Sequence, residues 1–146
     1  VPGPWVGCAA AAFGERRDRR IGVAVGDVVG PFTILPAAHS EITPAWVSAV
    51  VAVDGLRIYH SGDTLSFGEQ LDALRALAPD VVLLPANGRT AEHLGTPPNM
   101  SLEEGIELAR SCGARLLIPH HYDLFAVNSR PRDRLARVPA DAAPPP

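Results

Sequence analysis

Apolar and polar positions alternate in the first half of the chain in the way expected of β-strands. The segments with this pattern, or with a run of β-branched residues, are residues 21–25, 32–35, 46–53 and 56–59. Residues 27–31 are rich in turn-forming residues and predict a turn between the first two segments. Asp54-Gly55 is a typical two-residue hairpin turn, so we expect the third and fourth segments to pair as a hairpin.

From residue 67 onward the spacing becomes that of helices alternating with apolar strands. Phe67, Leu71, Leu74 and Leu77 recur at helical spacing, and Pro79 ends that helix. Residues 81–84 form a continuous apolar run, as expected for a strand covered on both faces.

A second helix and a further strand follow. Ser101 and Glu104 have the spacing of a capping box, Gly113 suits the left-handed end of a helix, and residues 116–118 predict another buried strand. This alternation predicts an α/β fold whose strands end at one edge of the sheet, where such folds bind their ligands.

Three residues that can bind metals follow three of the predicted strands. His39 follows the extended segment that begins at Phe32, Asp63 follows the strand after the hairpin, and His121 follows the last strand. A single histidine at such a place is more often structural than functional. Two imidazoles and a carboxylate that reach one edge form a ligand set suited to zinc or manganese, so we expect these three to lie together.

Other polar residues lie near the same expected edge. His60 could orient Asp63 through a hydrogen bond behind the metal, or it could simply pack at the end of its strand. Because side chains alternate along a strand, His120 is expected to point away from His121, so that only one of them can be a ligand. Ser61 is not favoured as a nucleophile, because nothing around it resembles a nucleophile elbow.

Asn87 and Arg89 are the candidates for substrate binding. Both belong to the segment Asn87-Gly88-Arg89, which follows a predicted strand. A guanidinium at this place could bind a phosphate or carboxylate on a substrate, although an ion pair that anchors the loop is equally compatible with the sequence.

Composition and charge narrow the range of functions. A length of 146 residues is typical of one domain. The net charge of −3 argues against a nucleic-acid-binding protein, which would normally have a basic surface. No apolar run approaches the length of a membrane span, and the order of charges near the start is the reverse of that in a signal peptide. Two cysteines, Cys8 and Cys112, form no disulfide framework, so we expect a cytoplasmic protein.

Several segments carry a resemblance to a known family. AAHS, VDGLRIYHSGDT, DVVLLPANGR, NMSLEEGIELA and ARLLIPHHYDLFAVN resemble the C-terminal half of a metallo-β-lactamase-fold hydrolase, in the branch that includes L-ascorbate-6-phosphate lactonase. The similarity runs from about Gly26 to Asn128. It implies the C-terminal half of an αββα fold, a β-sandwich flanked by helices, over residues 21–128. Residues 1–20 would be an irregular segment from a truncated front half, and residues 129–146 a proline-rich tail expected to be disordered.

The resemblance also implies roles for the three residues. The histidine matching His39 binds one metal, the aspartate matching Asp63 bridges two metals, and the histidine matching His121 binds the other. The family's H-x-H-x-D-H motif, which supplies four further ligands, is absent, because no histidine precedes His39. We therefore expect the back half of a hydrolase, by truncation, partial gene model or split gene, whose full-length parent holds two zinc or manganese ions.

The expected activity is hydrolysis of a lactone or similar ester in a small molecule, by a hydroxide that the metals activate. The substrate would carry an anionic group if Arg89 binds it, and neither a nucleic acid nor a membrane is expected as a partner. Homo-oligomerisation stays open. Two alternatives also stay open: an inactive truncated remnant or interaction module, and a phosphodiesterase or nuclease of the same fold.

Overall fold

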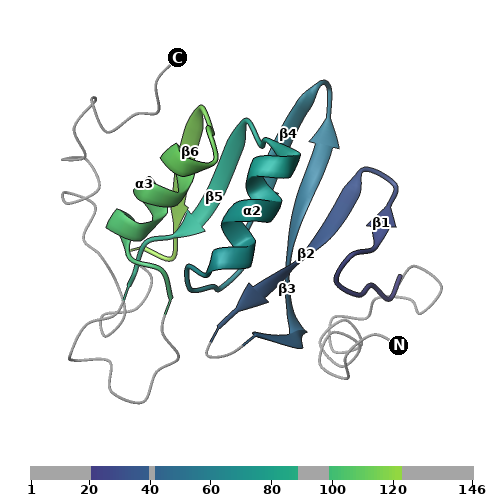
Figure 1. Ribbon diagram of the computed structural model, residues 1–146, viewed down its shortest axis with the longest axis horizontal. Helices are drawn as coiled ribbons and strands as arrows, with labels where there is room; N and C mark the ends of the chain where they lie inside the picture. The colour runs from purple at the N-terminus through teal and green to yellow at the C-terminus, as the bar shows by residue number, and fades with distance from the viewer. Residues whose placement is uncertain (1–20, 40–41, 89–98, 123–146) are drawn as a thin grey trace.

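The computed structural model describes residues 21–39, 42–88 and 99–122. Their framework is a six-stranded sheet in the order β1-β2-β3-β4-β5-β6, with two helices in front of one face (Figure 1). The α/β class expected from the sequence is therefore confirmed. The strands are β1 (Val28–Val29), β2 (Phe32–Ala38), β3 (Ile42–Val53), β4 (Leu56–His60), β5 (Val81–Pro85) and β6 (Leu116–His120), and the helices are α2 (Gly68–Leu77) and α3 (Leu102–Ser111).

The strand directions bring four strand ends to one edge of the sheet. Neighbours from β1 to β4 are antiparallel, whereas β4, β5 and β6 are parallel. Strands β2, β4, β5 and β6 therefore all run the same way, and we call the edge at which they end the carboxyl edge. His39, Asp63, Asn87 and His121 each follow one of these four strands, so the topology brings all four residues to the carboxyl edge.

The hairpin between β3 and β4 forms where the sequence predicts it. Val53 pairs with Leu56, and Asp54 and Gly55 have φ angles of 49° and 79°. Positive φ at both central residues is what a type I′ turn requires, and the Asp-Gly pair allows it.

The prediction for the start of the sheet was wrong. Residues 21–25 form no strand, and Val28–Val29, inside the expected turn, form the short strand β1 on the edge of β2. Turn chemistry explains the difference, because the Asp27 carboxylate accepts the Ala24 N–H at 2.7 Å and Gly26 has a φ of 93°. These local contacts fold the segment back before an extended strand can form.

Helix α2 ends, and helix α3 begins, where the sequence predicts. In α2, Ala78 takes a left-handed conformation directly before Pro79. In α3, Ser101 and Glu104 form the expected capping box, with distances of 3.1 Å from the Glu104 amide to the Ser101 hydroxyl and 2.8 Å from the Ser101 amide to the Glu104 carboxylate. Neither helix of the described residues is long and apolar enough to cross a membrane.

The hydrophobic core lies between the sheet and the helices. Tyr59 of β4 is fully buried there, and its hydroxyl accepts a hydrogen bond from the Gln70 amide of α2 at 2.9 Å. Cys112, at the end of α3, is a buried free thiol as expected, and burial raises its pKa. The buried members of the core are Val50, Tyr59, Leu74, Val82, Leu84, Met100, Leu108, Ala109, Cys112 and Ala114.

The opposite face of the sheet, which we call the open face, is apolar but uncovered by the described residues. Its side chains alternate with those of the core, so Val82 and Leu84 of β5 are buried while Val81 and Leu83 are only half-buried. The sequence predicts cover on both faces of this strand; among the described residues, the helices α2 and α3 cover one face only. Six large apolar residues of the open face are between 37% and 50% exposed: Phe32, Val47, Val53, Leu56, Leu116 and Ile118.

We predict that the 146-residue chain associates with itself through the open face. A contiguous apolar surface of this kind favours association. Light scattering during size-exclusion chromatography should report a dimer or larger species for the unaltered chain and a monomer for the Leu56→Lys, Leu116→Lys double variant. Ala76→Lys, on the exposed side of α2, is the matched control and should leave the association unchanged. A monomeric unaltered chain would contradict the prediction.

Candidate metal centre

Backbone hydrogen bonds hold the loop after β4 firmly at the carboxyl edge. Leu65 donates its N–H to the Ala38 carbonyl at 2.7 Å, and the Ala38 N–H donates to the Thr64 hydroxyl at 3.1 Å. The Thr64 carbonyl accepts the Met100 N–H at 2.7 Å, and the Thr64 side chain is fully buried. The loop that carries Asp63 is therefore tied both to the end of β2 and to the segment before α3.

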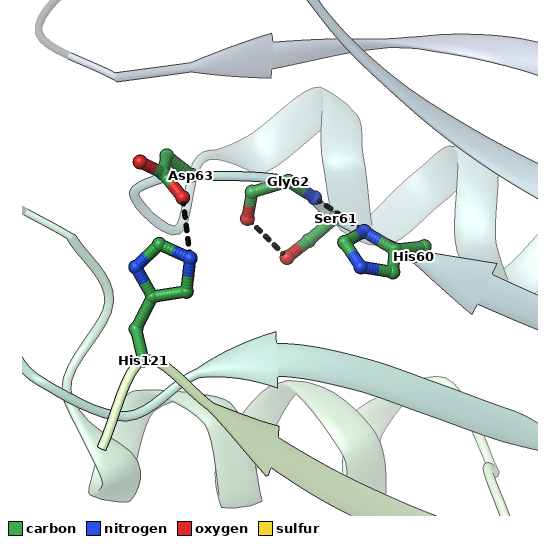
Figure 2. Close-up of polar contacts among 5 residues, drawn as sticks. All are labelled: His60, Ser61, Gly62, Asp63 and His121. Atoms are coloured by element: carbon green, nitrogen blue, oxygen red, sulfur yellow. Dashed lines mark hydrogen bonds and ion pairs between the residues drawn. The ribbon is translucent and has the colours of Figure 1, made fainter. Parts of the chain in front are cut away.

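Asp63 and His121 form the central pair of the candidate site. The His121 Nε2 lies 3.0 Å from the Asp63 Oδ1, and the side chains are 36% and 38% exposed respectively (Figure 2). The pair joins the loop after β4 to the residue after β6, so two residues predicted to lie together do so. Both remain accessible to an ion or a substrate from solvent.

The backbone of His121 explains how its ring reaches Asp63. His121 has a φ of 57°, one of the few positive values at a non-glycine residue in the described chain. This left-handed conformation is uncommon but is enriched in histidine. It ends the alternation of β6, and the expectation that His120 and His121 point to opposite sides was wrong. Their rings instead meet edge to face, with centroids 4.8 Å apart.

His60 shapes the turn that leads to Asp63. Its Nδ1 accepts the Gly62 N–H at 3.0 Å, and Gly62 has a φ of 61° (Figure 2). Ser61 is fully buried, and its hydroxyl donates to the Gly62 carbonyl at 2.8 Å. The Ser61 hydroxyl is thus buried and hydrogen-bonded within the loop, which agrees with the sequence argument against a serine nucleophile.

His120 has an uncharged ring that contacts the rings of His60 and His121. Its ring is stacked on that of His60, with centroids 5.1 Å apart and planes 17° apart. The pKa of His120 is lowered to about 4, mainly by burial and to a smaller extent by the nearby His121 and His60. The ring is therefore neutral at pH 7. The sequence argument placed His120 at this edge but pointing away from His121, because it assumed that strand alternation continues past His120.

His39 lies at the same edge but apart from the central pair. Its ring packs edge to face on Trp46, with centroids 5.1 Å apart. Its Nδ1 is buried without a hydrogen-bond partner among the described residues. Across residues 21–39, 42–88 and 99–122, no three His, Cys, Asp or Glu side chains converge in an arrangement that could hold a metal. The topology therefore brings His39 to the edge but does not join it to Asp63 and His121.

Contacts between residues 87–88 and residues 100–101 hold the two ends of the loop after β5 together, and we call this place the closed root of the loop. Asn87 pairs with Ser101 in an isolated β-bridge, and the Gly88 N–H donates to the Met100 carbonyl at 3.1 Å. The side-chain oxygens of Asn87 and Asn99 are buried without partners in the described structure. Asn87 is only 3% exposed, and the predicted substrate contact of Arg89 lies outside the described residues.

The chemistry of the donors fits a divalent metal. Imidazole nitrogens and carboxylate oxygens lie about 2.0–2.2 Å from zinc, so two ligands of one ion lie roughly 3 Å apart. The distance of 3.0 Å between Asp63 and His121 is compatible with this spacing. The unpartnered Nδ1 of His39 is a further nitrogen donor at the same edge. The described residues thus place two of the three predicted ligands together.

Comparison with known proteins places the chain in a family. Residues 14–122 match the model of the β-lactamase superfamily domain. A protein from Methanoculleus marisnigri named metal-dependent hydrolase is 36% identical over 103 residues, which are 64% of this chain and 42% of that protein. A protein of the same name from Korarchaeum cryptofilum is 37% identical over 121 residues, which are 77% of this chain and 51% of that protein. The chain spans about half the length of these relatives.

Solved structures share the fold. A metallo hydrolase from the archaeon Ignicoccus hospitalis aligns with a TM-score of 0.68 and 23% identity, over 95% of this chain and 60% of that one. An isothiocyanate hydrolase from Delia radicum gut bacteria aligns with a TM-score of 0.67 and 15% identity, over 92% of this chain and 56% of that one. With the family model covering most of the sequence, the chain belongs to the metallo-β-lactamase superfamily.

Proposed function

We propose that the chain forms part of a metal-dependent hydrolase that cleaves a lactone or a similar ester in a small molecule. The observation that carries the proposal is the Asp63–His121 pair, 3.0 Å apart and accessible at the carboxyl edge, where His39 also follows β2. The names of the homologous archaeal proteins, metal-dependent hydrolases, support the general activity. The choice of a lactone rests on the resemblance of the sequence segments to the L-ascorbate-6-phosphate lactonase branch.

Three residues would hold the metals. Asp63 would bridge two divalent ions, zinc or manganese, because a carboxylate has two oxygens to offer, and His39 and His121 would be terminal ligands to different ions. When bound, such ions lower the pKa of a water molecule and polarise the oxygen of the scissile carbonyl. The H-x-H-x-D-H motif, which supplies further ligands in the family that the sequence resembles, does not occur in these 146 residues.

The other residues of the edge would orient the ligands and the substrate. His60, by accepting the Gly62 N–H, keeps the turn in the shape that directs the Asp63 carboxylate toward His121. Arg89 would bind the substrate, with its guanidinium on an anionic group such as a phosphate or carboxylate. Asn87, the second substrate contact predicted from the sequence, is only 3% exposed and is not proposed to bind it.

We predict that this chain alone binds zinc or manganese weakly. The described residues place two ligands together rather than the three or four that close a zinc site. Metal analysis after prolonged dialysis in a chelator-free buffer should find well under one ion per chain. Two ions that stay bound through dialysis would contradict this prediction.

The activity of the proposed hydrolase, assayed as a whole, is tested with a panel of substrates in saturating zinc or manganese. Small lactones and carboxylic esters should be hydrolysed at a rate that depends on the metal and that His121→Ala lowers. A phosphodiester serves as the counter-substrate. Hydrolysis of the phosphodiester without hydrolysis of the lactones would contradict the proposed substrate class. No metal-dependent hydrolysis of either substrate would contradict the proposed activity of the hydrolase.

A further inference from the structure

The ring of His120 lies between two other imidazoles at the carboxyl edge. It is stacked on His60 at 5.1 Å, with the planes only 17° apart, and it meets the ring of His121 edge to face at 4.8 Å. One side chain at the end of β6 thus contacts a residue of β4 and the residue that follows β6.

Each of these two contacts acts on one member of the Asp63–His121 pair. On one side, His60 accepts the Gly62 N–H at 3.0 Å, and Gly62 directly precedes Asp63. A fixed His60 ring therefore fixes the turn that presents the carboxylate. On the other side, His121 is 36% exposed and would be free to change its rotamer if no neighbour restricted its ring.

An imidazole ring at position 120 fits the role of holding the neighbouring rings in place better than an aliphatic side chain that only fills space. The Nε2 of His120 is buried without a hydrogen-bond partner among the described residues, which is an unfavourable state for a polar atom. An aliphatic side chain would avoid that cost, but it would offer no flat face to the His60 ring and no ring to which His121 could pack edge to face.

We propose that His120 is a positioning residue whose ring, held between His60 and His121, fixes the geometry of the Asp63–His121 pair before any metal binds. This inference rests on the proposed metal-binding role of that pair. It assigns His120 no contact with the metal or the substrate. Loss of a group that orients a metal ligand typically weakens metal binding by about 10–100-fold.

The test compares three variants by zinc titration against a chromophoric chelator. His120→Ala, which removes the ring, should weaken zinc binding by about 10-fold or more. His120→Phe, which restores a flat ring without the nitrogens, should stay within about threefold of the unaltered chain. Ile118→Ala, on the same strand and the same open face, is the control for general loss of packing and should leave zinc binding unchanged.

A second measurement needs no metal. In nuclear magnetic resonance of the histidine rings in metal-free protein, contacts from the His121 ring to its neighbours should be clear in the unaltered chain and in His120→Phe, and lost in His120→Ala. If zinc binds nowhere but the ring signals behave in this way, the proposed function fails and the positioning role stands. If His120→Ala leaves both readouts unchanged, or if His120→Phe is as damaging as His120→Ala, the positioning role of the ring is overturned.

Discussion

In the proposed hydrolase of which this chain forms part, Asp63→Ala is expected to abolish most of the metal-dependent hydrolysis while leaving the fold intact. Asp63 is proposed to bridge both ions, so its loss should cost more than the roughly 10–100-fold that follows from losing a group behind a ligand. The cost to the fold should be small, because Asp63 is 38% exposed and a polar contact as exposed as the one it makes with His121 contributes less than about 1 kcal/mol. Zinc content, hydrolysis rate and thermal melting of the same preparation are the measurements.

Two further variants sharpen this experiment. Asp63→Asn keeps the shape of the side chain but removes its charge, and it should be nearly as damaging as Asp63→Ala, because a bridge between two cations requires a carboxylate. Asp72→Ala, an exposed carboxylate on α2, is the matched control and should behave like the unaltered chain. If Asp63→Ala retained its metals and near-normal turnover, the bridging assignment would be wrong, and the reading of the site would be wrong with it.

Leu84→Ala is expected to cause the largest loss of stability among single core substitutions. Leu84 is 1% exposed in the middle of β5, and α3 lies so close above it that a Cβ on Gly105 would be 3.6 Å from the Leu84 Cδ1. Such a close helix leaves little room for the cavity to collapse. Deleting a buried leucine costs about 2–5 kcal/mol, which in a domain of this size lowers the melting temperature by roughly 10–20 °C.

Leu116→Ala provides the matched control for this substitution. It makes the same change on the neighbouring strand β6, at a residue that is 50% exposed on the open face. Its cost should be less than about 1 kcal/mol when both variants are melted at concentrations where the chain is monomeric. Equal losses for the two variants would mean that the core does not lie between the sheet and the helices.

The parts of the fold that follow from short-range signals were predictable from the sequence. The hairpin at Asp54-Gly55 and the capping box at Ser101 each depend on residues no more than three positions apart, so their chemistry can be read locally. The meeting of Asp63 and His121 was also predictable, because parallel strands deliver their ends to a common edge. The roles assigned to His39, Asp63 and His121 in binding metal stay predictions.

The parts that were wrong depend on contacts that the local pattern does not contain. Residues 21–25 alternate like a strand, but the Asp27 carboxylate that accepts the Ala24 N–H folds them into a turn. The orientation of His121 depends on its left-handed φ of 57°, and its side chain meets Asp63 in the loop after β4. A strand alternation rule holds only while the strand continues, and β6 ends at His120.

The closed root of the loop after β5 has an evolutionary consequence. Because Asn87 is bridged to Ser101 and Gly88 is hydrogen-bonded to Met100, the chain that joins Gly88 to Asn99 leaves and returns at a point already fixed by the sheet and α3. Lengthening such an excursion costs only about 0.6 kcal/mol for each doubling of its length. Insertions at this position can therefore arise without displacing Asp63 or His121.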